Sequence, residues 1–228
     1  MNIVGLQKVS LLNYPGLVSA TIYVNGCNFK CPFCHNSSIV KCEYETLSED
    51  EIFKYLEERK KMLDGVCVSG GEPTTQKDLK DFILKLKNIG FKVKLDTNGY
   101  NPTVLKQLIE LKCLDYIAMD IKNSDEKYSK TAGVPIDIKI INESIDLIMH
   151  SGIDYEFRTT VVEELHSLAD IESIAKKISG AKAFYIQNFE DSGDIMQSNL
   201  HGFKKSKLEE FVNEAKKFIS NSNLRGID

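Results

Sequence analysis

Three cysteines between residues 27 and 34 have the types and spacing to do chemistry. Cys27, Cys31 and Cys34 follow the pattern C-x3-C-x2-C, and a loop of this length can direct three thiolates at one point. Protein iron–sulfur clusters normally take four thiolates, so three would leave one iron of a 4Fe–4S cluster open to substrate. The alternative is a zinc site with His35 or Cys42 as fourth ligand. Structural zinc sites usually draw on two separated pairs of ligands, so the spacing favours iron–sulfur.

Length and composition limit the class of protein. The chain has 228 residues, 42% of them hydrophobic, which is enough for one sizeable core. Because no linker-like stretch interrupts it, we assign a single domain over residues 1–228. A net charge of −4 argues against nucleic acid or a polyanionic membrane surface as the main partner. We see neither a membrane-spanning run nor a signal peptide, so we expect a cytoplasmic protein whose cysteines serve metal binding or catalysis rather than disulfides.

Strand-like and helix-like patterns alternate along the chain. Strands are predicted at residues 19–24, 65–69, 91–95, 115–119, 154–161 and 183–187. The segment after Ser48 reads as a helix with a capping box to Glu51 and an apolar face that includes Met62. The tail at residues 224–227 is expected to return as a strand. The other predicted helices are at residues 79–89, 102–111, 137–150, 168–178 and 206–219.

Six consecutive βα units predict a parallel sheet with right-handed crossovers. Six units are too few for a closed eight-stranded barrel, so we predict an α/β fold of the open, partial (β/α)6 barrel type. A doubly wound sheet is the alternative, which the missing G-x-G-x-x-G fingerprint after the first strand disfavours. Polar and glycine-rich clusters follow the strands, at the end where such barrels carry their active sites.

Four of these strand-end clusters resemble the radical S-adenosylmethionine (radical SAM) superfamily. Within it, the chain resembles activating enzymes of glycyl radical enzymes, most of all the single-domain activases of anaerobic ribonucleotide reductase, and it is similar to pyruvate formate-lyase activating enzymes. The resemblance extends from about residue 3 to 190. The motifs that carry it are Cys27-x3-Cys31-x2-Cys34-His35-Asn36, Gly70-Gly71-Glu72-Pro73, Asp96-Thr97-Asn98-Gly99 and Met119-Asp120-Ile121-Lys122.

The resemblance implies a chemistry that suits the three cysteines. Cys27, Cys31 and Cys34 would hold a 4Fe–4S cluster whose open iron binds S-adenosyl-L-methionine. One electron, from a flavodoxin- or ferredoxin-type donor, would cleave that cofactor to methionine and a 5′-deoxyadenosyl radical. The radical would take a hydrogen atom from a glycine of a glycyl radical enzyme subunit, in the first place anaerobic ribonucleotide reductase. The protein's task would be to bind, orient and exclude water.

The resemblance also implies residues that bind S-adenosylmethionine. Phe33 would pack on the adenine, unless it is a loop aromatic that fills the core. Gly70 and Gly71 would bond the methionine ammonium and Glu72 would add a carboxylate, the alternative being a glycine turn with a solvated Glu72. Related activases carry a histidine after the sixth strand, where Gln187 or Asn188 would substitute. His35, Asn36, Asn98 and Thr160 complete the implied set.

Two carboxylates at neighbouring strand ends require a charge partner. By resemblance, Asp96 and Asp120 would help to bind a monovalent cation near the cofactor carboxylate, and Lys122 is the other possible partner. Arg158 is expected to point toward the cofactor carboxylate or Asp120, with Thr160 on the same strand face. A structural Asp–Lys pair and a plain buried salt bridge are the alternatives.

Two other functions remain open for this sequence. One keeps the radical chemistry but acts on a small molecule, as in deazapurine synthesis. The other is a non-catalytic iron–sulfur electron carrier or zinc module, which would have no use for the clusters at the strand ends. Cys67 and Cys113 lie in apolar segments and are predicted to be core thiols. His150, His166 and His201 receive no role.

Overall fold

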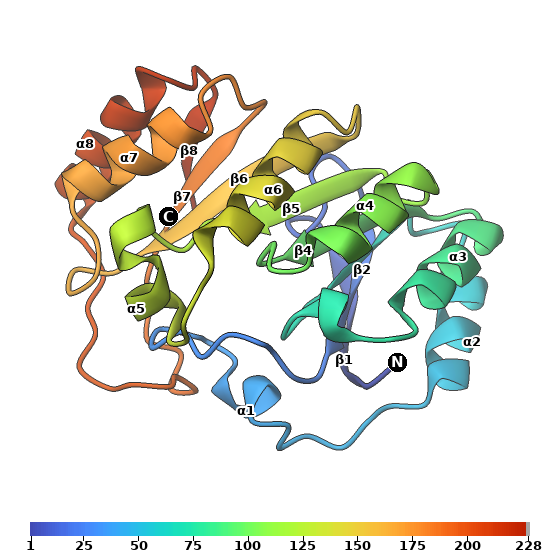
Figure 1. The fold of residues 1–228 in the computed structure, drawn as a ribbon. Helices are drawn as coiled ribbons and strands as arrows, with labels where there is room; N and C mark the ends of the chain where they lie inside the picture. Colours follow the sequence, from blue (N-terminus) through green and yellow to red (C-terminus); the bar gives the residue numbers. More distant parts are fainter. Residues whose placement is uncertain (227–228) are drawn as a thin grey trace. The chain divides into compact units, whose positions relative to one another are not determined.

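The computed structural model describes residues 1–226, which divide into two compact units (Figure 1). The N-terminal unit comprises residues 1–28, 38–97 and 101–117. The C-terminal unit comprises residues 29–37, 98–100 and the described residues from 118 onward. The assignment of a single domain to residues 1–228 stays a prediction.

The sheet has eight strands in the order β1 to β8. This order follows the sequence without the reversal that defines a doubly wound sheet, so the barrel type of winding is confirmed. Within the units, β2–β3, β3–β4 and β6–β7 pair in parallel. The six predicted strands are present as β2 (Ser19–Val24), β3 (Gly65–Gly70), β4 (Lys92–Thr97), β5 (Tyr116–Asp120), β6 (Asp154–Val161) and β7 (Phe184–Asn188).

Two further strands flank the predicted six. β1 (Ile3–Ser10) pairs antiparallel with β2. It was not predicted, because only its first and last residues are buried and its sequence lacks an alternating apolar pattern. β8 (Ser222–Arg225) pairs in parallel with β7. The returning tail strand is confirmed, but it begins two residues earlier than expected, and residue 227 lies outside the described residues.

In the N-terminal unit, α3 (Leu79–Ile89) ends at a left-handed Gly90 as predicted, and α4 (Pro102–Glu110) begins at a proline. The prediction for α2 (Glu49–Arg59) was wrong in two respects. Ser48 is the N-cap but makes no side-chain capping bond. The helix ends before Met62, whose side chain is 65% exposed and not part of the apolar face. The other helical segments are the short α1 (Ser37–Val40) and the 3-10 turn η1 (Pro73–Thr75).

In the C-terminal unit, α7 (Leu168–Lys177) and α8 (Lys205–Lys216) pack against each other, and α8 covers β7 and β8 (Figure 1). Phe157, Phe184 and Phe211 are fully buried in this core. A 3-10 turn, η2 (Asp125–Lys127), leads into α5 (Tyr128–Ala132), and neither was predicted because both are shorter than the helical period can reveal. The remaining helix of this unit is α6 (Ile138–Met149).

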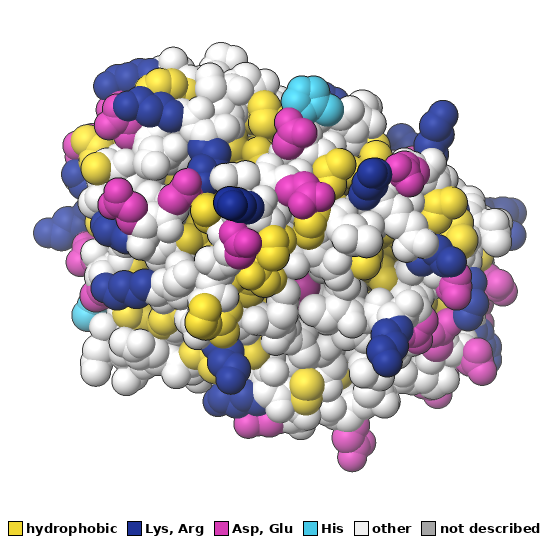
Figure 2. All heavy atoms as spheres, in the orientation of Figure 1, with side chains coloured by type: hydrophobic (Ala, Val, Ile, Leu, Met, Phe, Trp, Pro, Cys, Tyr) yellow, Lys and Arg dark blue, Asp and Glu magenta, His cyan; other side chains and the backbone are white. Residues whose placement is uncertain are grey.

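Surface charge is mixed on the face drawn in Figure 2, where Lys and Arg side chains alternate with Asp and Glu. In the described part of the chain, no helix has both the length and the apolar character needed to cross a membrane.

A buried ion pair fastens the last strand of the C-terminal unit. Glu156 on β6 is completely buried, and its two carboxylate oxygens accept hydrogen bonds from Nη1 and Nη2 of Arg225 on β8, the Nη2–Oε2 distance being 2.8 Å. The guanidinium carbon of Arg225 also lies 3.7 Å from the ring centroid of Tyr185. A buried carboxylate is costly unless it is paired, so Glu156 fixes where β8 must lie.

Arg225→Ala should lower the free energy of unfolding by about 3 kcal/mol, because it leaves the buried Glu156 carboxylate without its partner. Urea unfolding followed by circular dichroism measures this loss. The matched control is Lys182→Ala, which breaks an exposed pair with Asp154 and should cost less than about 1 kcal/mol. Equal small losses in both variants would show that the Glu156 pair does not hold β8.

Candidate functional site

The second part of the cysteine loop, residues 29–37, is seated on α5. The backbone N–H of Lys30 donates to the carbonyl of Ala132 at 2.9 Å. Gly133, with φ of +70°, follows α5, and a Cβ there would lie 2.0 Å from the Lys30 carbonyl oxygen. Phe29 is 1% exposed and packs against the Tyr100 ring at 5.6 Å between centroids. The loop backbone is therefore held against a helix end where only glycine fits.

The segment after β7 holds the other side of this loop. The His35 ring stacks on Phe189 with centroids 5.6 Å apart. The Ser37 hydroxyl donates to Asp194 Oδ1 at 2.6 Å, and the N–H of Gln197 donates to the Pro32 carbonyl at 3.0 Å. Burial lowers the pKa of His35, so the ring is neutral and serves as a stacking surface.

None of the three motif cysteines is in a disulfide. Cys31 is 7% exposed, and burial raises the pKa of its thiol to about 11. Cys34 follows in a tight turn, its N–H donating to the Cys31 carbonyl at 3.0 Å. Cys27 belongs to the N-terminal unit and is partly exposed. Among residues 1–226, no three His, Cys, Asp or Glu side chains are gathered as ligands of a single ion, whereas a four-iron cluster binds each cysteine to a different iron.

The donor set of the motif fits an iron–sulfur cluster. Cys27, Cys31 and Cys34 are not in disulfides, and thiolates are the ligands that such clusters take. One buried polar atom next to the motif, Oδ1 of Asn25, has no hydrogen-bond partner among residues 1–226. That the three cysteines hold the cluster stays a prediction.

The glycine motif after β3 lies against the segment that leads into Cys27. A Cβ on Gly70 would lie 2.3 Å from the Val24 nitrogen, and one on Gly71 would lie 1.9 Å from the Gly26 oxygen. The Gly71 N–H donates to the Val24 carbonyl at 2.8 Å. The sequence predicted that a ligand would lie close to Gly70 and Gly71. In this structure, the backbone of Val24 and Gly26 lies close to them.

Glu72 is 1% exposed, so the solvated glutamate considered from the sequence is wrong. Its Oε1 accepts hydrogen bonds from the Thr74 N–H at 3.1 Å, the Thr74 hydroxyl at 2.6 Å and the Thr97 hydroxyl at 2.8 Å. The carboxylate thus ties the end of β3 to the end of β4. Its expected contact with a cofactor stays a prediction.

Asp96 has a partner that the sequence reasoning missed. The Lys94 ammonium, on the same face of β4 and 1% exposed, pairs with Asp96 Oδ1, and the Ser69 hydroxyl donates to Oδ2 at 3.0 Å. The signal was present, because residues two apart on a strand share a face. Asp96 lies in the N-terminal unit and pairs with Lys94, whereas Asp120 lies in the C-terminal unit and pairs with Lys122.

Asp120 joins two cations in the C-terminal unit. Its Oδ1 accepts from Arg158 Nε at 2.8 Å and its Oδ2 from Lys122 Nζ at 3.2 Å. Both predicted pairings with Asp120 are confirmed. Burial disfavours both charged forms, but the opposite charges outweigh it, so the pKa of Asp120 falls below its usual range and that of Lys122 rises. The three side chains stay ionised at neutral pH, with one net positive charge.

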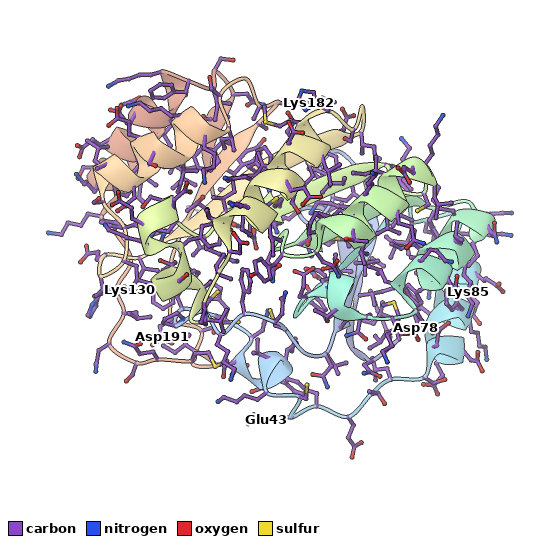
Figure 3. The ribbon with its side chains drawn as sticks, in the orientation of Figure 1. Glu43, Asp78, Lys85, Lys130, Lys182 and Asp191 are labelled. Atoms are coloured by element: carbon purple, nitrogen blue, oxygen red, sulfur yellow. The ribbon has the colours of Figure 1, made fainter. Side chains whose placement is uncertain are left out.

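A cavity of about 440 Å³ opens beside this charge cluster. Arg158 and Thr160 both face it from β6, as expected for residues two apart on a strand. The structure thus brings together five of the predicted residues, namely His35, Asp120, Arg158, Thr160 and Gln187. The sequence reasoning missed two acidic residues of the cavity lining, Glu190 and Asp191, on the segment after β7. Asp191 is labelled in Figure 3.

The structure distinguishes Gln187 from Asn188, which the sequence left open as substitutes for the histidine of related activases. Asn188 Nδ2 donates to the Phe203 carbonyl at 3.1 Å, and its Oδ1 accepts from the Phe203 N–H at 2.8 Å. Both ends of this amide are used by backbone. Gln187, which also lines the cavity, is the better candidate ligand residue.

The sequence analysis assigned no role to His166, but its side chain is buried, at 4% exposure, and bonds the backbone next to Asp120. Its Nδ1 accepts from the Val162 N–H at 3.1 Å, so Nε2 carries the proton and donates to the Lys122 carbonyl at 2.8 Å. Burial lowers the pKa of His166, which keeps this neutral form. Phe33 packs edge-on against the imidazole at 6.4 Å, consistent with the core-filling alternative for Phe33.

Asn98 and Asn36 are among the predicted residues that are not part of the cavity lining. Asn98 Oδ1 accepts from the Tyr100 N–H at 3.0 Å within the turn after β4. Asn36 is exposed at the start of α1. Their contacts with a cofactor stay predictions. Cys67 and Cys113 are confirmed as core thiols, at 0% and 2% exposure.

Comparison with known proteins places this site in a family. Residues 21–178 match the model of the Radical SAM superfamily. The chain belongs to the radical SAM superfamily. This membership implies a 4Fe–4S cluster and S-adenosylmethionine as cofactors, and the cysteine motif lies inside the matched region.

Curated relatives of this radical SAM protein include two from Methanocaldococcus jannaschii, both provisionally named glycyl-radical enzyme activating enzymes. The first is 37% identical over 232 residues, covering 98% of this chain and 95% of its own. The second is 33% identical over 179 residues, covering 76% and 63%. A protein of Saccharolobus solfataricus, provisionally named a GTP 3′,8-cyclase, is 32% identical over 112 residues, covering 48% of this chain and 36% of its own.

Solved structures of other proteins share the fold. Streptococcus suis SuiB bound to its precursor peptide SuiA matches with a TM-score of 0.70 at 15% identity, over 90% of this chain and 48% of that chain. The enzyme anSMEcpe with bound AdoMet matches with a TM-score of 0.64 at 17% identity, over 85% and 57%. This chain therefore spans about half the length of those structures. The predicted partial barrel is confirmed.

Asp120→Asn in this radical SAM protein should lower the free energy of unfolding by about 2 kcal/mol at pH 7, because it leaves two neighbouring cations without their carboxylate. The pKa of Asp120 lies below its usual 3.8, so its stabilisation is fully present above about pH 4 and is lost as acid protonates the carboxylate. The gap between wild type and variant should therefore narrow below pH 4. Denaturant titrations at several pH values measure this gap.

The matched control for this prediction is Asp154→Asn, which alters an exposed pair with Lys182. It should change stability by less than about 1 kcal/mol at every pH. If Asp120→Asn gave the same small and pH-independent change, the charge cluster would not contribute to folding.

Proposed function

We propose that this chain is the activating enzyme of a glycyl radical enzyme, with an anaerobic ribonucleotide reductase subunit as the first candidate substrate. The observation that carries the proposal is the 37% identity to a provisionally named activating enzyme over 98% of this chain and 95% of the relative. A match along nearly the whole of both chains argues for a shared activity more strongly than a match confined to the cysteine region.

In this proposal Cys27, Cys31 and Cys34 hold the 4Fe–4S cluster. When bound, the cluster supplies the electron that cleaves S-adenosylmethionine to methionine and the 5′-deoxyadenosyl radical, which takes one hydrogen atom from the partner's glycine. The loop anchors on α5 fix where the Cys31 and Cys34 sulfurs lie. Metal binding must remove the Cys31 proton, since burial raises the pKa of that thiol to about 11.

The cavity of the C-terminal unit is suited to bind part of the cofactor. Arg158 is held by Asp120 and faces the cavity as a fixed cation, so it can pair with the cofactor carboxylate. Gln187 and Thr160 add polar contacts from neighbouring strands. Gly70, Gly71 and Glu72 keep their proposed contact with the methionine ammonium. The monovalent cation, the flavodoxin- or ferredoxin-type donor and the cytoplasmic location stay predictions.

The second candidate is a radical SAM enzyme that acts on a small molecule. The similarity to a provisionally named GTP 3′,8-cyclase favours it, but that similarity covers 48% of this chain. A match over less than half of either chain does not distinguish substrates. A non-catalytic electron carrier remains the third candidate, and cofactor cleavage separates it from the other two.

Anaerobically reconstituted protein should hold one 4Fe–4S cluster and, once reduced with dithionite, convert S-adenosylmethionine to 5′-deoxyadenosine. Cys31→Ala should abolish this product because it removes one of three cluster thiolates. Chromatography of the nucleoside measures it. Cys42→Ala is the control, since Cys42 is exposed and outside the motif, and it should retain activity. Activity that survives Cys31→Ala, or zinc as the native metal, would refute the proposal.

Electron paramagnetic resonance identifies the substrate. Mixed with an anaerobic ribonucleotide reductase subunit from the same cell, the reduced enzyme and S-adenosylmethionine should give a carbon-centred glycyl doublet. The doublet should vanish when the subunit's radical-bearing glycine is replaced by alanine. A silent spectrum with every glycyl radical subunit of that cell, alongside turnover of a heterocyclic metabolite, would favour the small-molecule candidate.

A further inference from the structure

Lys94 is a buried cation that the sequence analysis did not consider. It lies on β4 in the N-terminal unit, and its ammonium pairs with Asp96 Oδ1. The ammonium also lies 3.9 Å from the Cys67 sulfur and 6.0 Å from the ring centroid of Tyr116. A thiol and an aromatic ring are weak partners for a buried ammonium, so the Asp96 carboxylate provides its counter-charge.

The second oxygen of Asp96 is engaged as well. Its Oδ2 accepts a hydrogen bond from the Ser69 hydroxyl at 3.0 Å, so each carboxylate oxygen has a donor from the same unit. The pair of Lys94 and Asp96 carries no net charge. A further cation on this carboxylate would place two positive charges side by side at a largely buried site, where like charges repel strongly.

The Asp120 carboxylate in the C-terminal unit is balanced by the protein in the same way. Arg158 and Lys122 both bond it, which leaves this cluster with one positive charge in excess. The sequence analysis named a monovalent cation as charge partner of Asp96 and Asp120. Because each carboxylate already has a cationic side chain as partner, the residues present do not fit a site for such an ion.

We propose that Lys94 is the built-in counter-cation of Asp96 and takes the place of the monovalent cation at this carboxylate. A tethered ammonium balances the carboxylate at any concentration of sodium or potassium in solution. Lys94 acts through Asp96 and is therefore a positioning residue. The link between Asp96 and the cofactor rests on the proposed function, whereas the pairing of Lys94 with Asp96 is independent of it.

The unfolding temperature of the cluster-free protein in three salts tests the proposal. Wild type should unfold at the same temperature in potassium, sodium and tetramethylammonium chloride at equal ionic strength, because no site selects a small cation. Lys94→Met keeps an unbranched apolar side chain but leaves Asp96 without its ammonium. This variant should unfold at a lower temperature than wild type, and potassium or sodium should raise that temperature relative to tetramethylammonium.

Two further variants assign the effect to this pair. The double variant Lys94→Met with Asp96→Asn removes both charges, so it should show no preference among the salts. In tetramethylammonium chloride it should unfold at a higher temperature than Lys94→Met, since loss of a whole buried pair is tolerated better than loss of one partner. Lys87→Met is the matched control, because it breaks a partly exposed pair with Asp115 in the same unit. It should also show no preference.

The comparison of wild type with the double variant decides the question even if Lys94→Met folds in none of the salts. Stabilisation of wild type by potassium or sodium that the double variant lacks would overturn the inference, because an ion would then bind at Asp96 although Lys94 is present. A folded Lys94→Met variant without any salt preference would overturn it too.

None of these measurements needs the iron–sulfur cluster, so the proposed function can fail while this inference holds. In cluster-loaded wild type, conversion of S-adenosylmethionine to 5′-deoxyadenosine should proceed at the same rate in all three salts. A rate that falls when tetramethylammonium replaces potassium and sodium would overturn the inference and leave the proposed function intact.

Discussion

Pairing of buried charge is the constraint on which the C-terminal unit depends. Lys122 and Arg158 are each largely buried and both bond Asp120. A charge removed from water must find a partner or lose its charge. The backbone next to Asp120 is also held by hydrogen bonds. The Ile121 N–H donates to the Arg158 carbonyl at 2.8 Å, and the Lys122 carbonyl accepts a hydrogen bond from His166 Nε2. The end of β5 is thereby bound to β6 through both side chains and backbone.

Burial decides the state of the nearby Cys31 thiol, and the neighbouring charges only modify it. Lys122 lowers the pKa of Cys31, but burial is the larger effect and brings it to about 11. At pH 7 the neutral thiol is therefore favoured by roughly 5 kcal/mol, taking 1.36 kcal/mol for each unit. A bound metal must supply that free energy to obtain the thiolate, and coordination does so readily. Without a metal, Cys31 is therefore a neutral thiol at pH 7, and metal binding converts it to the thiolate.

The sequence predicted the parts of the fold that rest on long apolar periods and on residue spacing. The six parallel strands, the proline and glycine at the ends of α4 and α3, and the barrel winding all follow from such patterns. β1 was not predicted from the sequence, because few of its residues are buried. The capping box predicted from Ser48 to Glu51 is not formed, because a local sequence motif does not by itself fix side-chain contacts.

The site was predictable in its residues but less so in their contacts. Asp120 was one of two expected partners for Arg158 and for Lys122, the other being the cofactor, since strand ends converge and opposite charges pair. The partners of Glu72 were not expected, because Thr97 lies 25 positions away and a hydroxyl carries no distinctive pattern. The role of His166 was missed for a different reason, since both of its partners are backbone groups, which every residue has. Hydrogen bonds from a side chain to the backbone therefore leave no signal in a single sequence.

The glycines near the cysteine motif show how a ligand-binding pattern also serves the fold. In the N-terminal unit, Gly71 lies against the Gly26 carbonyl, one residue before Cys27. In the C-terminal unit, Gly133 lies against the Lys30 carbonyl, one residue before Cys31. In each case a methyl group would overlap a backbone oxygen, which packing cannot relieve cheaply. The backbone next to Cys27 and next to Cys31 is therefore positioned by close packing against two glycines, in addition to the side-chain contacts of Phe29, His35 and Ser37.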